Sequence, residues 1–361
     1  MHNKHIICLV KMRFKDIEIS NFRGIKNIRL ENLGLINVFL GRNNVGKSTL
    51  LESIFMLAGM TNPMLPSQLN FIRESKHGDM SYVKYLFNKV NLSEHPLIKG
   101  STTNDEVRKV EIVAINNIET PNNKNLMGLS SKDNNYINGV ELICDDGKQS
   151  FSTKLINNNG KLSLSSTIEY IENIKAILIS SNSKEGNVLE GYSELVRRKQ
   201  KDAIIQALNN FDSRIISIEA LSDGLYLQFQ GIEELLPISM AGDGVRRFLG
   251  IVAFIVDPTT DIVLIDEIEN GLHYTAYSKL WESLIRSAMQ NNVQLFVTTH
   301  SDETLRCLSR IYEKMQVDNN IKSEDIRVYT IDKEIDGQQQ AYGLSAEGLL
   351  GAIENNIEIR K

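Results

Sequence analysis

The sequence predicts an α/β fold in which helices cover a largely parallel sheet, with an antiparallel β subdomain and a short helical insertion added. Three largely apolar runs, at 35–40, 261–265 and 293–298, predict the parallel sheet. Strands buried on both faces lose the usual alternation of apolar and polar residues. Amphipathic stretches at 274–290 and 301–314 follow the last two runs. This alternation of strand and helix is typical of a sheet built with βα crossovers.

The composition is that of a soluble globular protein. The chain has 361 residues, 42% of them hydrophobic and 24% charged, and 40 Lys and Arg against 45 Asp and Glu give a net charge of −5. This balance excludes a histone-like polycation but leaves a local basic groove for nucleic acid open. No apolar run approaches the ~18–20 residues that span a bilayer, so we expect no membrane partner. The cysteines Cys8, Cys144 and Cys307 lack metal-ligand spacing, which favours a reducing compartment and a cytoplasmic protein.

The N-terminal residues divide into an extension and a pair of strands. Residues 1–11 resemble a signal peptide only weakly, because the apolar stretch 6–10 is shorter than the roughly 7–15 residues of a signal-peptide core. A more regular segment opens at Met12, where we expect the folded chain to begin, and the translation start stays open between the first two methionines. From 14 to 30, apolar residues alternate on either side of Gly24, which predicts two antiparallel strands.

A glycine-rich loop joins the first apolar run to a predicted helix at 50–58. It reads Gly41-Arg-Asn-Asn-Val-Gly46-Lys47-Ser48, which satisfies the phosphate-binding pattern G-x-x-x-x-G-K-[ST]. The glycines let backbone N–H groups point at phosphates, and the start of the following helix favours an anion. Lys47 would reach the β- and γ-phosphates, and Ser48 would bind Mg²⁺. The predicted nucleotide contacts are Gly41, Arg42, Asn43, Asn44, Val45, Gly46, Lys47, Ser48 and Thr49.

The first part of the middle region predicts loops and then an antiparallel sheet. Residues 60–105 have no long period, so we expect loops with short helices there. Between 107 and 170, alternating runs predict an antiparallel sheet of about four strands. Turn-prone Asn clusters at 122–123, 134–135 and 157–160 separate these runs.

The second part of the middle region predicts a helix followed by strands. Residues 187–211 carry a helical apolar stripe, and we expect strands at 215–219 and 225–229. No heptad pattern persists for three repeats, so no coiled-coil arm is expected. The basic run 197–201 has two interpretations, a solvated helix face or a contact with nucleic acid.

Two acidic residues follow the second apolar run. Asp266 and Glu267 stand at the carboxyl end of a predicted parallel strand, where open α/β sheets bind ligands. Asp266 would hold Mg²⁺, and Glu267 would polarise the attacking water as a general base. His300 follows the next strand and is expected at the same edge, as a sensor of the γ-phosphate. Lys47, Glu267 and His300 are therefore the predicted catalytic residues.

A second group of glycines precedes a predicted helix at 244–256. Ser239, Gly242, Asp243 and Gly244 combine a hydroxyl, two glycines and a helix start, which can bind an anion. A turn or a helix cap would explain the same glycines equally well.

These segments together resemble the ABC-type ATPases of the RecF/SMC/overcoming-lysogenization-defect branch, often labelled AAA family ATPases. The opening NFRGIKN, the phosphate loop, SMAGDGVRR, LIDEIENGLH and FVTTHS stand in the order of that family and span nearly the whole chain from Met12. The resemblance implies a P-loop NTPase fold with an ABC-ATPase-like mixed sheet, with ATP and Mg²⁺ as cofactors. It also implies a homodimer or higher homo-oligomer with composite ATP sites. In these sites the 239–244 segment of one copy acts on nucleotide held by Lys47 and Ser48 of another.

The sequence also departs from the family pattern. The segment around Gly242 is not LSGGQ, and Gln68 is only one candidate for the family's glutamine loop. The residues after His300 are too few for a C-terminal Toprim domain, so a nuclease or toxin effector would be a separate chain. In the turn after the acids, His273 has two interpretations, a structural role or a contact with a partner subunit. ATP is expected rather than GTP, because no Asn-Lys-x-Asp motif is present.

Two functions stay open on this basis. The first is an ATP-hydrolysing switch that serves as sensor or scaffold for a separate effector in bacterial anti-phage defence. The alternative is a RecF-like repair ATPase that binds DNA directly. An ATP-driven transporter subunit is disfavoured, because such subunits normally carry LSGGQ and lack the NFRG opening.

We expect four parts along the chain. The first is an N-terminal extension at 1–11, and the second is an ATPase lobe at 12–170 with the phosphate loop and the antiparallel β subdomain. A helical insertion with return strands follows at 171–235. A second ATPase lobe at 236–361 carries the glycine segment, the acidic pair and His300.

Overall fold

The computed structural model describes most of the chain, in two large sheets and one small sheet. The described residues are 11–73, 80–116, 137–158, 160–180, 192, 200–317, 321–334 and 338–359. The predicted turns at 122–123 and 134–135, most of the extension 1–11 and most of the basic run 197–201 lie outside these residues.

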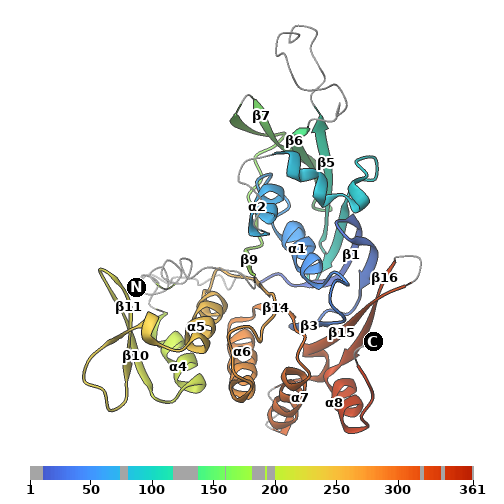
Figure 1. The fold of residues 1–361 in the computed structure, drawn as a ribbon. Coiled ribbons are helices and arrows are strands. Elements are labelled where there is room, and N and C mark those ends of the chain that lie inside the picture. The colour runs from blue at the N-terminus through green and yellow to red at the C-terminus, as the bar shows by residue number, and fades with distance from the viewer. Residues whose placement is uncertain are drawn as a thin grey trace, which may run out of the picture.

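A six-stranded, largely parallel sheet runs through the middle of the molecule (Figure 1). Its strands in spatial order are β16 (Gln339–Ser345), β15 (Ile326–Lys333), β3 (Ile36–Leu40), β14 (Gln294–Thr298), β13 (Ile262–Ile265) and β9 (Ala176–Ile179). All neighbouring pairs are parallel except β15 with β16. The three apolar runs form β3, β13 and β14, as the sequence predicted.

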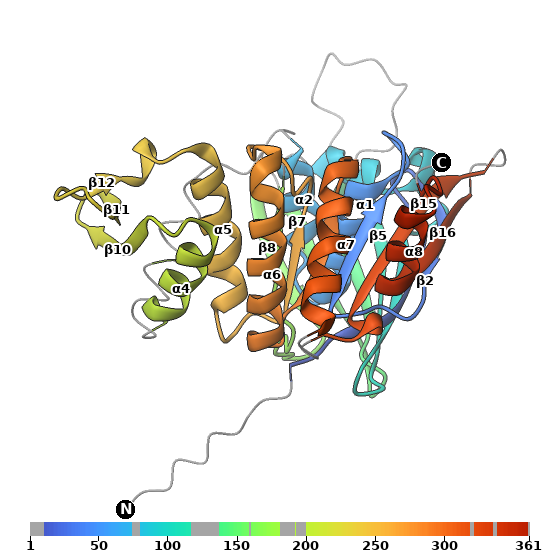
Figure 2. The same cartoon turned by 90° about the horizontal axis from the view of Figure 1, so that it is seen from below.

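Both faces of this sheet are buried, which explains why the runs are largely apolar. In β13, Ile262 and Leu264 pack on one side and Val263 and Ile265 on the other, and all four are fully buried. Helix α1 (Lys47–Ala58) covers the first side. A row of helices covers the second side (Figure 2): α5 (Asp243–Val256), α6 (Tyr277–Asn291), α7 (Asp302–Val317) and α8 (Ala346–Glu354).

A seven-stranded antiparallel sheet packs on the other side of α1. Its order is β2 (Ile25–Leu30), β1 (Phe14–Phe22), β4 (Leu97–Thr102), β5 (Val107–Asn116), β6 (Ile137–Asp145), β7 (Ser150–Asn158) and β8 (Lys161–Ser166). The sequence predicted the N-terminal hairpin and the strands after 107 as separate units. The structure joins them through β4, which lies in the range 60–105, where the sequence predicts loops with short helices.

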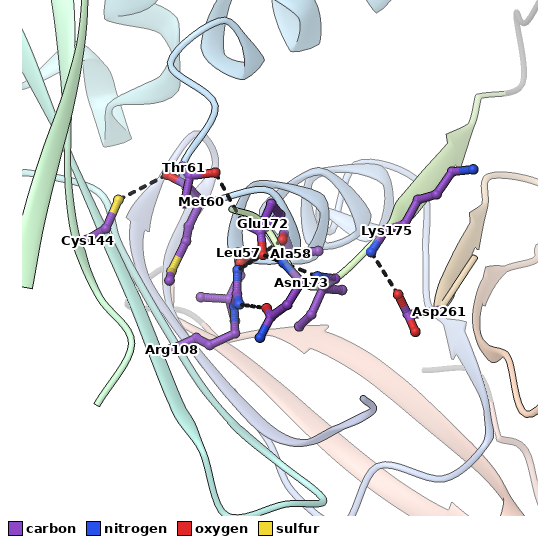
Figure 3. Close-up of polar contacts among 11 residues, drawn as sticks. Leu57, Ala58, Met60, Thr61, Arg108, Cys144, Glu172, Asn173, Lys175 and Asp261 are labelled. Atoms are coloured by element: carbon purple, nitrogen blue, oxygen red, sulfur yellow. Dashed lines mark hydrogen bonds and ion pairs between the residues drawn. The ribbon is translucent and has the colours of Figure 1, made fainter. Parts of the chain in front are cut away.

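Arg108 of β5 joins helix α1 to the segment that connects the two sheets. Its guanidinium is 2% exposed, and it donates to the carbonyls of Leu57 and Ala58 at the end of α1, at 3.3 and 3.1 Å. The same group donates to Glu172 Oε1 at 2.7 Å and to Asn173 Oδ1 at 3.0 Å (Figure 3). A cation at a helix C-terminus satisfies carbonyls that have no partner within the helix.

The remaining elements are short. Helix α4 (Lys201–Phe211) and the three-stranded sheet β10 (Ile215–Leu221), β11 (Gly224–Phe229) and β12 (Leu236–Pro237) lie beyond α5 at one end of the helix row (Figure 2). Between α1 and β4 the chain forms α2 (Leu65–Ile72) and two 3₁₀ turns, η1 (Met80–Leu86) and η2 (Asn88–Val90). Three further 3₁₀ turns are η3 (Ile238–Met240), η4 (Tyr274–Ala276) and η5 (Ser323–Asp325).

The predicted division of the chain does not coincide with the division between the sheets. The range 12–170 supplies β3 to the six-stranded sheet as well as the whole seven-stranded sheet. The range 171–235 supplies β9, which pairs with β13 in the six-stranded sheet. The four-part organisation therefore stays a prediction. Among the described residues, no helix combines the length and hydrophobicity that a bilayer span needs.

Candidate functional site

The loop between β3 and α1 has a backbone that requires glycine at two positions. Gly41 has φ 140° and Gly46 has φ 106°, both in the region that L side chains rarely adopt. A Cβ on Gly41 would lie 2.4 Å from the carbonyl oxygen of Ile331 in β15. Gly46 is the N-cap of α1 and offers no side chain to cap the helix. The first backbone N–H groups of α1 therefore face the loop, as an anion-binding helix start requires.

Lys47 folds back over this loop. The side chain is buried, and its Nζ donates to the carbonyl of Gly41 at 2.8 Å and to that of Arg42 at 2.9 Å. Arg42, Asn43 and Asn44 at the tip of the loop are exposed. The ammonium group thus lies inside the curve of the loop, where the phosphates of a nucleotide would be held.

The end of β13 approaches the start of α1. Ser48 Oγ donates to Asp266 Oδ1 at 3.1 Å. Thr298 Oγ1, at the end of β14, donates to the same Asp266 oxygen at 2.7 Å. β3, β13 and β14 are parallel neighbours, so their carboxyl ends meet at one edge of the sheet. A hydroxyl and a carboxylate oxygen side by side are ligands that Mg²⁺ prefers, so the residues present fit that ion.

Glu267 lies beside His300 at the same edge. Glu267 Oε1 is 3.4 Å from His300 Nε2, and each side chain is about one-third exposed. Asn270 Nδ2 donates to Glu267 Oε2 at 2.7 Å, and the backbone N–H of His300 donates to Glu269 Oε1 at 2.6 Å. Glu267 has φ 49°, an unusual value for a residue other than glycine. A strained backbone held at the predicted base is typical of functional positions.

Arg247 of α5 makes a hydrogen bond to the backbone of the acidic turn, residues 266–269. Its Nη2 donates to the carbonyl of Asp266 at 3.0 Å, and its Nη1 donates to the carbonyl of Ser180 at 3.3 Å. Burial lowers the pKa of Arg247, while the carboxylates of Asp266, Glu267 and Glu269 oppose this shift. The guanidinium stays charged at neutral pH, because the unperturbed pKa is far above 7.

The glycine segment at 239–244 lies beside the turn that follows the acids. A Cβ on Gly244 would lie 3.0 Å from Leu272 Cδ2, and Gly271 faces the Cβ of Asp243. Ser239, Gly242 and Asp243 are exposed, and Asp243 forms an ion pair with Arg246. The structure thus presents this segment to solvent, while Lys47, Ser48, Asp266, Glu267 and His300 meet at the end of the parallel strands.

Two further candidates lie on exposed surfaces. His273 is exposed, its Nδ1 is 2.9 Å from Thr275 Oγ1, and its ring contacts the exposed Tyr274. Gln68 is exposed on α2. Neither position decides between the interpretations that the sequence left open.

Sequence reasoning assigned no role to Thr298, Arg247 or Asn270. Each makes a hydrogen bond to the acidic turn. Thr298 and Asn270 could have been found from their positions, because one ends the strand beside β13 and the other follows the acids by a few residues. Arg247 comes from a different helix, and its contact depends on how α5 packs on the sheet.

Comparison with known families and proteins matches two parts of the chain. Residues 131–306 match the family described as "AAA domain, putative AbiEii toxin, Type IV TA system". Residues 12–80 match a family described as a protein of unknown function, DUF2813.

Individual proteins and a solved structure also resemble this chain. A Helicobacter pylori protein named ATP/GTP phosphatase is 24% identical over 327 residues, which cover 82% of this chain and 88% of the relative. The DNA replication and repair protein RecF of Citrifermentans bemidjiense is 29% identical over 104 residues, 29% of this chain and 24% of that protein. An SMC head solved with the C-winged helix domain of ScpA matches 92% of this chain and 98% of its own, at 12% identity and a TM-score of 0.50. At that identity the SMC head shows a common fold.

Proposed function

We propose that this chain, an ABC-type ATPase of the RecF/SMC branch, binds ATP with Mg²⁺ at loop 41–49 and hydrolyses it between two copies of itself. One observation carries the proposal: hydroxyl and carboxylate groups from the start of α1, from the turn after β13 and from the end of β14 form a single connected network at one edge of the sheet. The network runs from Ser48 through Asp266 and Thr298 to Glu267, which contacts His300. The resemblance to nucleotide hydrolases supports the nucleotide as its ligand.

Lys47 and four residues of this network then have separate chemical tasks. Lys47 and the N–H groups at the start of α1 hold the β- and γ-phosphates. Ser48 and Asp266 offer oxygen ligands to Mg²⁺, which neutralises charge on the phosphates when it is bound. Glu267 accepts a proton from the attacking water. His300, which contacts Glu267, orients the γ-phosphate.

The exposed glycine segment supplies the second half of the site in this proposal. Ser239, Gly242, Asp243 and Gly244 would contact nucleotide held by the other copy, so ATP joins two copies and hydrolysis separates them. A ligand that binds the joined state better shifts the population toward it. The switch would report to a separate effector, such as a Toprim-type nuclease or a toxin, in anti-phage defence inside the cytoplasm. The AAA family that matches residues 131–306 is described by a toxin–antitoxin system, which supports a link to a toxin.

Replacing Glu267 tests the proposal. Glu267→Gln keeps the size of the side chain but removes the base, so we expect kcat to fall by about 10²–10⁴-fold. Binding of ATP should persist, and light scattering should show the joined form accumulating with ATP and Mg²⁺. Glu282→Gln is the matched control, because Glu282 pairs with Lys314 and Arg286 on the outer surface of α6. Turnover of ATP by Glu267→Gln at the wild-type rate would contradict the assignment of the base.

A further assay tests whether the chain prefers ATP or GTP as its substrate. The sequence favours ATP over GTP, whereas the name of the Helicobacter pylori relative includes both. Parallel assays with ATP and GTP decide the matter. We expect kcat/KM to be higher with ATP.

A RecF-like repair ATPase that binds DNA directly is the second candidate, and the partial matches to RecF favour it. Of the basic run 197–201, the described residue Lys201 is paired with Glu219 at 2.7 Å rather than free for phosphates. Binding to duplex DNA with ATP present, measured at increasing salt, tests this function, because phosphate contacts predict a steep fall of affinity with salt. Absence of binding at low salt would exclude it.

A further inference from the structure

Thr298 is the last residue of β14 and is fully buried at the edge where the candidate site lies. Its neighbours in the sheet are Phe39 of β3, with which it is in register, and the end of β13, where Ile265 pairs with Val297. This register puts Thr298 beside Asp266, the first residue after β13. A hydroxyl buried at this position needs a hydrogen-bond partner, because an unpaired buried hydroxyl is costly.

The Thr298 hydroxyl makes two hydrogen bonds whose directions are fixed. It donates its single proton to Asp266 Oδ1 at 2.7 Å, and it accepts the backbone N–H of Glu267 at 2.8 Å. A carboxylate can only accept and an N–H can only donate, so the hydroxyl must act in this order. Hydrogen bonds to a charged oxygen are stronger than those between neutral groups.

The backbone of Thr298 also makes a hydrogen bond to Ile268, the residue that follows Glu267 in the acidic turn. Its carbonyl accepts the N–H of Ile268 at 3.1 Å. Glu267 is therefore held from both sides, through its own N–H and through that of Ile268, while it adopts φ 49°. A residue in this left-handed conformation persists only when its surroundings impose it.

We propose that Thr298 is a positioning residue, whose hydroxyl fixes Glu267 and Asp266 relative to each other and to Ser48. This inference rests on the proposed function and deepens it, because it assigns the geometry of the base to a residue outside the acidic pair. Asp266 Oδ1 receives hydroxyls from both Ser48 and Thr298, so the carboxylate has a defined orientation before any ligand binds. Thr298 acts through Glu267 and does not touch the reacting atoms.

The test replaces the hydroxyl while keeping the shape of the side chain. Thr298→Val should lower kcat by about 10²-fold, because a small misplacement of a catalytic group has an effect of this size. The Kd for ATP should stay unchanged, since Lys47 and the loop are untouched. Thr298→Ser retains the hydroxyl and should recover most of the rate. If the valine variant does not fold, Thr298→Ala serves in its place.

Thr260 provides the matched control. It is fully buried like Thr298 but precedes β13, at the opposite edge of the sheet. Within the described part of the chain its hydroxyl has no hydrogen-bond partner. Thr260→Val should therefore leave the ATPase rate unchanged.

A second measurement separates failure of this inference from failure of the proposed function. Hydrogen–deuterium exchange of the peptide that contains Glu267 and Ile268 should be faster in Thr298→Val than in the wild type and in Thr298→Ser. ATP turnover at the wild-type rate, or hydrogen exchange as slow as in the wild type, would overturn the positioning role of Thr298 if found in Thr298→Val. In that case, loss of activity in Glu267→Gln would still support the proposed ATPase function. If exchange is faster in Thr298→Val but the wild type hydrolyses no nucleotide, the result would support the positioning of Glu267 by Thr298 and overturn the proposed function.

Discussion

Ser48 Oγ lies 3.1 Å from Asp266 Oδ1, although 218 positions of the chain separate the two residues. The contact exists because the loop 41–46 leads from the end of β3 into α1, and β13 is separated from β3 only by β14. Both atoms are suited to one divalent cation, which binds hydroxyl and carboxylate oxygens together with phosphate.

Removal of the Ser48 hydroxyl should raise the Mg²⁺ requirement. In Ser48→Ala the cation loses one of two protein oxygens, and we expect the free Mg²⁺ that gives half-maximal ATPase activity to rise about tenfold (~1.4 kcal/mol). Ser53→Ala is the control, because Ser53 is buried in the same helix and its hydroxyl donates to Leu50 O instead. An unchanged Mg²⁺ dependence in Ser48→Ala would exclude Ser48 as a ligand.

Mixtures of two inactive variants test whether the glycine segment acts between copies. Lys47→Ala would remove the proposed phosphate contact and Ser239→Arg would block the exposed segment, so each alone should be inactive. When copies exchange freely in an equal mixture, about half of the dimers contain one copy of each variant. Each mixed dimer has one of its two composite sites intact, so we expect about a quarter of the wild-type rate. ATPase assays of the mixture and of each variant decide the matter. A mixture as inactive as its components would indicate that the segment does not act across the interface.

Arg108 is expected to stabilise the connection between the two sheets. Arg108→Met removes the partner of Glu172 and leaves the carbonyls at the end of α1 without their donor. Buried carbonyls left without their donor cost about 1–3 kcal/mol, so unfolding should occur at clearly lower denaturant. The control Arg29→Met breaks an exposed pair with Glu31 and should change stability by less than about 1 kcal/mol. Equal stability of Arg108→Met and wild type would contradict this account.

Cys144 should resist alkylation in the folded protein. The thiol is buried and donates to the carbonyl of Met60 at 3.0 Å (Figure 3), and burial raises the pKa of Cys144 to about 12. At pH 8, below this pKa, the group stays protonated, and the thiolate is the reactive form. Cys307 is only partly buried and should react with iodoacetamide before Cys144, as peptide mass spectrometry would show. Labelling of Cys144 as fast as Cys307 would show that the core around Met60 opens readily.

Local patterns made the nucleotide-binding half of the fold predictable. The sequence of β3, loop 41–49 and α1 is continuous, so an apolar run, two glycines and a lysine predict it without knowledge of the rest. β13 and β14 were predictable for the same reason. Their ends place Asp266 and His300 at one edge, because parallel neighbours share their direction.

Other features depend on contacts between distant segments and leave no local pattern. β4 contains Gly100 and follows Pro96, so it reads as a loop, yet it pairs with β1 and β5 to complete the seven-stranded sheet. β9 has only four residues and is recognisable through its pairing with β13. The role of Thr298 likewise depends on which side chains the register places beside it.

Calorimetric titration of ATP with Mg²⁺ into the wild-type protein and Lys47→Ala tests the central claim most directly. Lys47 lies inside the curve of the phosphate loop, within hydrogen-bond distance of two of its carbonyls. Lys148→Ala, a change to an exposed lysine on a turn of the seven-stranded sheet, is the control. We expect saturable binding by the wild type and by Lys148→Ala, and loss of binding in Lys47→Ala. Absence of binding to the wild type, or equal binding by Lys47→Ala, would contradict the claim that these strand ends form a nucleotide site.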